Sequence, residues 1–91
     1  MPGVIIYKTK EPNHYYSFIF ADQPTYRHAK HDIRGNNDEI IWKKGNVGPE
    51  QAKNAQETIN NLVKRLNNSE EVNLDIEKAK LEDFFKCGES H

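Results

Sequence analysis

The sequence predicts an α+β fold: a small antiparallel sheet of three or four strands that packs on one main helix, followed by a C-terminal helix. Short runs of β-branched and aromatic residues in the first half of the chain indicate the strands. Apolar residues at helical spacing over residues 49–66 indicate the main helix, and a second helical pattern begins near residue 75. The length of 91 residues corresponds to a single domain, 1–91, of which residues 69–91 would be an acidic helical extension.

The first two predicted strands form a hairpin. Residues 4–7 are an apolar, β-branched run, residues 8–13 indicate a turn, and residues 14–21 are an aromatic-rich strand. Side chains of the second strand alternate between two largely apolar faces, with Tyr16, Phe18 and Phe20 opposite Tyr15, Ser17 and Ile19. One helix covers one face of a small sheet, so we expect the second face to contact another copy, a different protein or a nucleic-acid base.

The segment 22–38 has no clear pattern. An Asp-Gln-Pro sequence interrupts the strand and the following residues are polar and basic, so a strand extension, a helical turn and a long loop all stay open. The third strand is predicted over residues 39–44, with Ile40 and Trp42 on one face and Ile41 on the other.

The helix over residues 49–66 is the most regular element of the sequence. Pro49 suits the first helical turn, where its missing N–H costs no hydrogen bond, and Glu50 complements the helix dipole. Its apolar stripe consists of Ala52, Ala55, Ile59, Leu62, Val63 and Leu66. We expect this stripe to pack on the sheet, with Ile59 and Leu62 against Phe18 and Trp42 or their same-face neighbours.

The segment 71–76 has two interpretations. Alternating Val72, Leu74 and Ile76 fit a fourth strand, and the same residues also fit the start of the last helix, which would end at Gly88. We expect the second sheet face, formed by Tyr15, Ile19 and either Ile5 or Tyr7, to be covered by a homodimer contact or by Phe84 and Phe85 of this helix.

Charge and cysteine content exclude several classes of protein. The net charge is −1, so no global electrostatic attraction to nucleic acid or membrane is expected. The charge is uneven, with 10 basic against 7 acidic residues in 1–68 and 3 against 7 in 69–91. The single cysteine, Cys87, allows no intrachain disulfide, and the chain contains no apolar run long enough to cross a bilayer. We therefore expect a soluble cytoplasmic protein with no membrane contact.

No residue pattern points to catalysis or to a metal. His28 and His31 lie three residues apart beside Asp32, but a zinc site needs three or four ligands in tetrahedral reach, and only His14 is a further candidate. None of the three serines lies in a nucleophile elbow. We expect no enzymatic activity, no catalytic residue, no metal and no cofactor.

The basic segment 26–34 is the predicted partner-binding surface, because arginine and tyrosine are enriched at binding hot spots. Lysine and arginine there can also hold phosphates, and sheet aromatics can stack bases. The predicted partner-binding residues are Tyr26, Arg27, His28, Lys30, His31, Arg34 and Tyr15.

The hairpin and the strand-to-helix passage resemble the YegP-like family of small bacterial domains. The matching pieces are Ile6-Tyr7-Lys8, Tyr15-Tyr16-Ser17-Phe18, Asn37-Asp38-Glu39-Ile40-Ile41, and the helix with Ala52, Asn54, Ala55 and Ile59. The resemblance covers about residues 4–63. It implies a sheet-and-helix fold and pairing of sheets between subunits, and it implies no catalytic residues. The chain departs from the family pattern in its Asn37-Asp38 turn, in extra residues near 24–34 and in its acidic tail.

The predicted function is that of a non-catalytic small protein that acts by occupying a surface of a partner. The partner is another protein, or a second copy in a homodimer, and one concrete form is a phage- or mobile-element-encoded inhibitor of a host protein. The main alternative is a nucleic-acid-binding module that uses residues 26–34 and the exposed sheet aromatics, and a third is a small enzyme or metal protein that uses His28 and His31.

Overall fold

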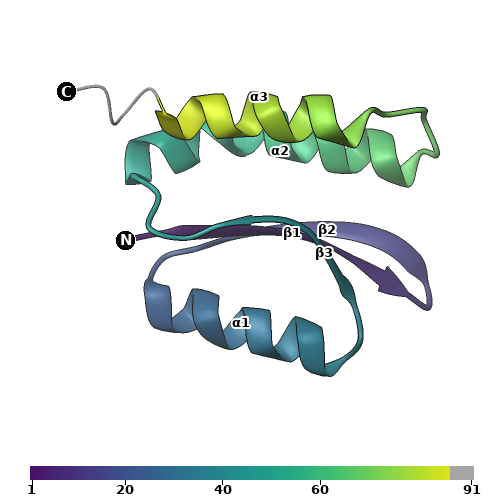
Figure 1. The fold of residues 1–91 in the computed structure, drawn as a ribbon, viewed down its shortest axis with the longest axis horizontal. Helices are drawn as coiled ribbons and strands as arrows, with labels where there is room; N and C mark the ends of the chain where they lie inside the picture. The colour runs from purple at the N-terminus through teal and green to yellow at the C-terminus, as the bar shows by residue number, and fades with distance from the viewer. Residues whose placement is uncertain (87–91) are drawn as a thin grey trace.

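The structure is a computed structural model that describes residues 1–86. Its elements follow one another as β1 (Gly3–Lys10), β2 (Asn13–Phe20), α1 (Gln23–Gly35), β3 (Glu39–Lys44), α2 (Pro49–Asn67) and α3 (Leu74–Lys86). Within these residues three strands form one antiparallel sheet in the order β2-β1-β3, with α1 on one face and α2 and α3 on the other (Figure 1). The predicted α+β fold is confirmed, and its sheet has three strands.

The hairpin of β1 and β2 has a much shorter turn than predicted. The strands pair continuously from Gly3 with Phe20 to Lys10 with Asn13, so only residues 11 and 12 connect them. The Glu11–Pro12 peptide bond is cis. The polar residues 8–10 belong to the ladder because a strand hydrogen-bonds through its backbone and needs no apolar side chain.

Residues 23–35 form helix α1, so the long-loop interpretation of this segment is wrong. The Asp22 carboxylate caps the helix by accepting a hydrogen bond from the Thr25 N–H at 2.8 Å, and this bond lowers the pKa of Asp22. Pro24 lies in the first turn, where its missing N–H removes no helical bond. The Asp-Gln-Pro sequence that ends β2 is therefore also the start of a helix.

Helix α1 covers the sheet face that carries Ile5. Tyr26 and Ile33, two helical turns apart, are buried against this residue. The Tyr26 ring lies directly on the backbone of Gly3, where any Cβ would overlap ring atoms. Tyr26 is thus a core residue, 5% exposed, with little surface left for a partner, and its role in partner binding stays a prediction. The sheet face that was expected to need a partner is covered in part by α1.

A β-bulge in β3 separates Ile40 from Trp42, which were expected on one face. β1 pairs Ile6 with Trp42 and Tyr7 with Ile40, which leaves Ile41 as an extra residue. An extra residue reverses the alternation of side chains along the strand. Ile40 therefore packs with the α1 core, whereas Trp42 packs with the α2 and α3 core.

The larger core lies between the sheet and helices α2 and α3. Its buried members are Val4, Ile6, Trp42, Val47, Ala52, Ala55, Ile59, Leu62, Leu81 and Phe85. Ile59 and Leu62 share this core with Trp42 as predicted, but Phe18 points to the opposite face and is 49% exposed. Of the two alternatives, α2 contacts Trp42 and its same-face neighbours Val4 and Ile6 and not Phe18, because the register places Phe18 opposite Ile5.

Helix α3 packs beside α2 on the same sheet face. The Phe85 ring stacks on Trp42 with ring centroids 5.8 Å apart. Glu82 accepts hydrogen bonds from the Trp42 indole at 3.1 Å and from the Lys44 ammonium at 2.9 Å. The predicted grouping of Ile19 with Ile5 or Tyr7 is wrong, because β2 pairs Ile19 with Val4, which belongs to the α2 side.

The segment 71–76 contains the start of α3 and forms no strand. The Asn73 side chain accepts a hydrogen bond from the Ile76 N–H at 3.2 Å, which is the geometry of a helix N-cap. This cap, and burial of Leu81 further along the helix, outweigh the short apolar alternation. The predicted helix stop at Gly88 and the lone Cys87 lie outside the described residues.

Candidate functional site

A row of aromatic side chains lies on the α1 side of the sheet, mainly on edge strand β2. Its members, called here the aromatic row, are Tyr7, Tyr16, Phe18 and Phe20. Tyr7 stacks on both Tyr16 and Phe18 at centroid distances of 5.4 and 6.1 Å, and Phe18 lies 5.9 Å from Phe20. Phe18 is half exposed, which shows that helix α1 covers this row only in part.

A groove of about 240 Å³ separates the aromatic row from α1. It is lined by Tyr7, Phe18, Phe20, Ala29, Asp32, Ile33, Asn36 and Asp38. Partial burial raises the pKa of Tyr7, and the neighbouring Tyr16 and Asp38 raise it further. The lining of the groove is apolar on the sheet side. Asp32 and Asp38 place carboxylates on the side of α1 and of the α1–β3 turn.

The Asn67 side chain closes part of the free edge of β2. Its Oδ1 accepts from the Tyr15 N–H at 2.7 Å, and its Nδ2 donates to the Tyr15 C=O at 3.0 Å and lies 3.2 Å from His14 Nε2. Both backbone groups of Tyr15 thus point away from β1. A carboxamide from the end of α2 occupies the position that a neighbouring strand would take.

The rest of this edge is open at Ser17 and Ile19. In an antiparallel ladder, alternate residues direct both backbone groups to the same side, so Ser17 and Ile19 point outward as Tyr15 does. Within residues 1–86 these outward groups have no hydrogen-bond partner. Ile19 is also 37% exposed, so an open backbone and exposed apolar side chains coincide.

The two sheet edges differ in their protection against strand pairing. Natural edge strands are commonly protected by charged side chains, prolines or bulges. β3 has a bulge at Ile41 and carries Lys43 and Lys44, whereas β2 contains no lysine, arginine, carboxylate or proline. β2 is the edge at which another strand meets least obstruction.

The predicted partner-binding residues do not form one surface. Arg27, Lys30 and Arg34 recur at helical spacing on one stripe of α1, and the Lys30 ammonium lies 4.8 Å from the Tyr26 ring centroid. His28 is exposed and lies 3.4 Å from Asp32, which belongs to the groove side of the helix. His31 is exposed as well.

Tyr15 lies apart from all of these residues. It pairs with Lys8, its ring approaches the Lys8 ammonium, and its backbone is held by Asn67. The register directs the Tyr15 side chain to the α2 side of the sheet, so Tyr15 does not share a face with α1, and its role in partner binding stays a prediction.

A basic hollow of about 450 Å³ lies along β3. Arg34 from α1, Lys43 from β3 and Lys78 from α3 line it, together with Asp38, Ile40, Ile41 and Trp42. These three cations come from separate elements, so no local pattern in the sequence predicts that they lie close together. The basic stripe of α1 continues into this hollow through Arg34.

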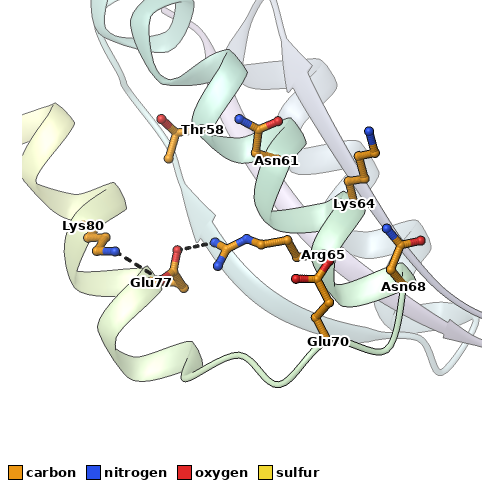
Figure 2. A pocket seen from close by; sticks show the side chains of 8 residues that line it. All are labelled: Thr58, Asn61, Lys64, Arg65, Asn68, Glu70, Glu77 and Lys80. Carbon is orange, nitrogen blue, oxygen red and sulfur yellow. Dashed lines mark hydrogen bonds and ion pairs between the residues drawn. The ribbon is translucent and has the colours of Figure 1, made fainter.

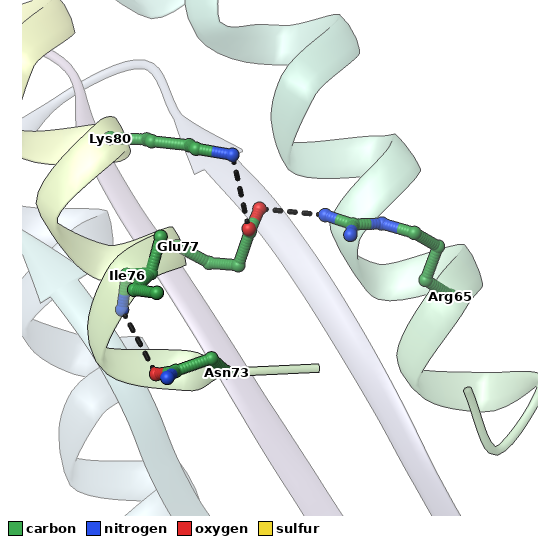
Figure 3. A network of polar contacts seen from close by, with 5 residues as sticks. All are labelled: Arg65, Asn73, Ile76, Glu77 and Lys80. Carbon is green, nitrogen blue, oxygen red and sulfur yellow. Dashed lines mark hydrogen bonds and ion pairs between the residues drawn. The ribbon is translucent and has the colours of Figure 1, made fainter. Parts of the chain in front are cut away.

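A second, polar hollow of about 550 Å³ lies between α2 and α3 (Figure 2). Glu77, 8% exposed, reaches Arg65 at 2.6 Å and Lys80 at 3.4 Å (Figure 3). The hydrogen bond from Arg65 is the main reason that the pKa of Glu77 is lowered. Both cations that face Glu77 are engaged with it, so this cluster joins the two helices.

The described residues contain no group of three or more His, Cys, Asp and Glu side chains arranged to hold a metal ion. No helix in residues 1–86 has the length and apolar character needed to cross a membrane.

Comparisons with protein-family models, with curated proteins and with solved structures find no match to this chain. The resemblance to the YegP-like family stays a prediction.

Proposed function

We propose that this protein is a non-catalytic binding protein that holds an extended segment of a polypeptide against the open edge of β2. The observation that carries this proposal is the coincidence, at one edge, of unpaired outward backbone groups at Ser17 and Ile19 with the exposed side chains of Phe18 and Ile19. Addition of a strand to a sheet edge is a common mode of peptide recognition.

In this proposal the backbone and the side chains of β2 have separate tasks. Hydrogen bonds with Ser17 and Ile19 would supply affinity for any extended chain, because every non-proline residue offers the same backbone groups. Alternate side chains of the added strand would face the aromatic row and the groove beside α1, while the others would face Ile19. The aromatic row and groove would therefore select the sequence of the partner.

A pair of variants at Ser17 tests this proposal. Because the Ser17 N–H points away from β1, Ser17→Pro removes an outward donor and leaves the β1–β2 ladder intact. Ser17→Ala removes only the hydroxyl. Used as immobilised bait with a cell lysate, the alanine variant should capture the same protein as the unchanged chain, and the proline variant should lose it. Equal capture by all three forms would exclude the edge as the binding site.

The basic hollow favours a second candidate function, binding of an acidic macromolecule such as a nucleic acid. Arg34, Lys43 and Lys78 converge there, and Arg27 and Lys30 extend the positive charge along α1. Replacing Arg27, Lys30 and Arg34 together by alanine should abolish such binding, and affinity should fall steeply with added salt. Capture that survives nuclease treatment and is unchanged in this triple variant would exclude this candidate.

An inhibitor of a host protein encoded by a phage or mobile element is one biological setting for either mode of binding. It rests on the small size of the chain and its lack of catalytic patterns.

A further inference from the structure

We propose that the strand bound at the open edge is β2 of a second copy of this chain, paired antiparallel about a two-fold axis at Phe18. The inference rests on the proposed function, because it names the polypeptide that occupies the same edge. The supporting observation is the position of the open backbone groups, because these groups can pair with the same groups of an identical strand.

The open groups select one register. If Ser17 of one copy lies opposite Ile19 of the other, each such pair exchanges two N–H···O bonds, as in any hydrogen-bonded antiparallel pair. The two-fold axis generates the same pair on its other side. All outward N–H and C=O groups of Ser17 and Ile19 in both copies are then bonded.

The Asn67 contact excludes one neighbouring symmetric register. A pairing centred on Ser17 would require the backbone of Tyr15 opposite Ile19, but both Tyr15 groups are held by Asn67. A pairing centred on Ile19 would place Ser17 opposite Ala21, which lies beyond the end of β2. The register centred on Phe18 lies wholly within the strand and leaves Asn67 in place.

Side chains are also complementary in this register. The two Phe18 rings meet as a non-hydrogen-bonded pair, in which Cα atoms lie about 4.5 Å apart. Tyr16 of each copy faces Phe20 of the other, so the aromatic rows join on the α1 side. On the α2 side the small Ser17 faces the larger Ile19. Both exposed apolar side chains of the strand, Phe18 and Ile19, are thereby covered.

Charge and chain direction permit the pairing. Residues 13–20 carry no lysine, arginine, aspartate or glutamate, so two copies of this strand meet without like-charge repulsion. In this register the residue opposite Tyr15, where Asn67 lies, is Ala21 of the other copy, which lies beyond the end of β2 and is not needed for the pairing. The product is one continuous sheet with both copies of α1 on the same face.

Sedimentation equilibrium over a range of protein concentration tests the association. The unchanged chain should show a monomer–dimer equilibrium. Phe18→Lys, which places like charges opposite each other, and Ser17→Pro should each raise the dissociation constant by about tenfold or more. Ile76→Lys replaces another exposed apolar residue, located on α3, and should leave the constant unchanged.

Disulfide trapping tests the register. In a Cys87→Ser background, Phe18→Cys should form a covalent dimer on mild oxidation, because the predicted Cα separation lies within disulfide range. Ile19→Cys should not, because each residue 19 lies opposite Ser17 of the other copy. Efficient trapping at residue 17 or 19 in preference to residue 18 would overturn the register.

A synthetic peptide with the sequence of residues 13–22 separates this inference from the proposed function. A chain that stays monomeric up to about 1 mM overturns the dimer. If that monomer still binds the peptide, and Ser17→Pro abolishes the binding, strand addition stands with a different partner. If it neither dimerises nor binds the peptide, the second copy is excluded as the occupant of the edge, whereas equal lysate capture by the unchanged chain, Ser17→Ala and Ser17→Pro would exclude the proposed function itself.

Discussion

Single side chains decide how each edge and face of this sheet is used. Asn67 binds both backbone groups of Tyr15, so the open part of the β2 edge between Tyr15 and the end of the strand is that of Ser17 and Ile19. Gly3 has a similar local importance, because the absence of a side chain at residue 3 lets the Tyr26 ring lie on the strand.

A methyl group at residue 3 should destabilise the protein. Gly3→Ala places a Cβ into the Tyr26 ring near its attachment point, where the ring cannot move aside, so we expect a loss of about 1–3 kcal/mol in the free energy of unfolding. Gly35→Ala is the matched control, because a Cβ there meets nothing within 4 Å. Urea unfolding of both variants measures the difference. Equal stability of Gly3→Ala and the unchanged chain would contradict the packing of Tyr26.

At the scale of elements, α2 contributes four buried residues, more than any other element, to the core on its side of the sheet. Leu62 is 2% exposed, and Leu62→Ala should lower the free energy of unfolding by about 2–5 kcal/mol through lost burial and a new cavity. Asn60→Ala, an exposed change on the same helix, should have little effect. Thermal unfolding compares the two, and an unchanged melting temperature for Leu62→Ala would mean that the helix faces the sheet with another side.

The pairing of α2 with α3 should depend on pH through Glu77. Its pKa is lower in the folded protein than the ordinary 4.5, so the folded state favours the carboxylate. The resulting stability is complete above the ordinary pKa and is lost as the pH falls through the lower, folded-state pKa. Glu77→Gln should therefore lose stability at pH 7, and its melting temperature should fall less on acidification than that of the unchanged chain. Parallel pH profiles for the two proteins would show that Glu77 is not involved.

At the scale of the whole molecule, two cores share the central strand β1. Ile5 contributes to the core under α1, while Val4 and Ile6 contribute to the core under α2 and α3. Loss of either core should therefore weaken the strand on which the other depends.

Coupling of the two cores can be measured with Trp42, the single tryptophan, which lies in the α2 and α3 core. Ile33→Ala creates a cavity only under α1 and should cost about 2–5 kcal/mol. If the layers unfold together, urea curves from Trp42 fluorescence and from far-ultraviolet circular dichroism should coincide, and the variant should shift both equally. A shift confined to circular dichroism would show that α1 unfolds independently.

Local sequence patterns determined much of the secondary structure. The bounds of β3, the apolar stripe of α2 and the presence of a C-terminal helix follow from residues close together in the chain, because helical and strand periodicities depend on near neighbours. The alternation of residues in the second strand also predicted that both of its faces are largely apolar. Helix α1 could be predicted in part, because Asp22 and Pro24 are typical of a helix start and Tyr26 and Ile33 have helical spacing.

Tertiary structure alone decided which of these features form a site. The bulge at Ile41 reassigns Ile40 and Trp42 to opposite cores, and it exists only as a difference in pairing between two strands. The Tyr26 ring is buried because the chain brings α1 over Gly3, and the same crossing leaves the aromatic row half open. Asn67 closes the edge at Tyr15 across 52 residues of sequence. Such contacts join residues that are far apart in the sequence. They form only when the complete fold has brought the elements together, so local sequence patterns do not predict them.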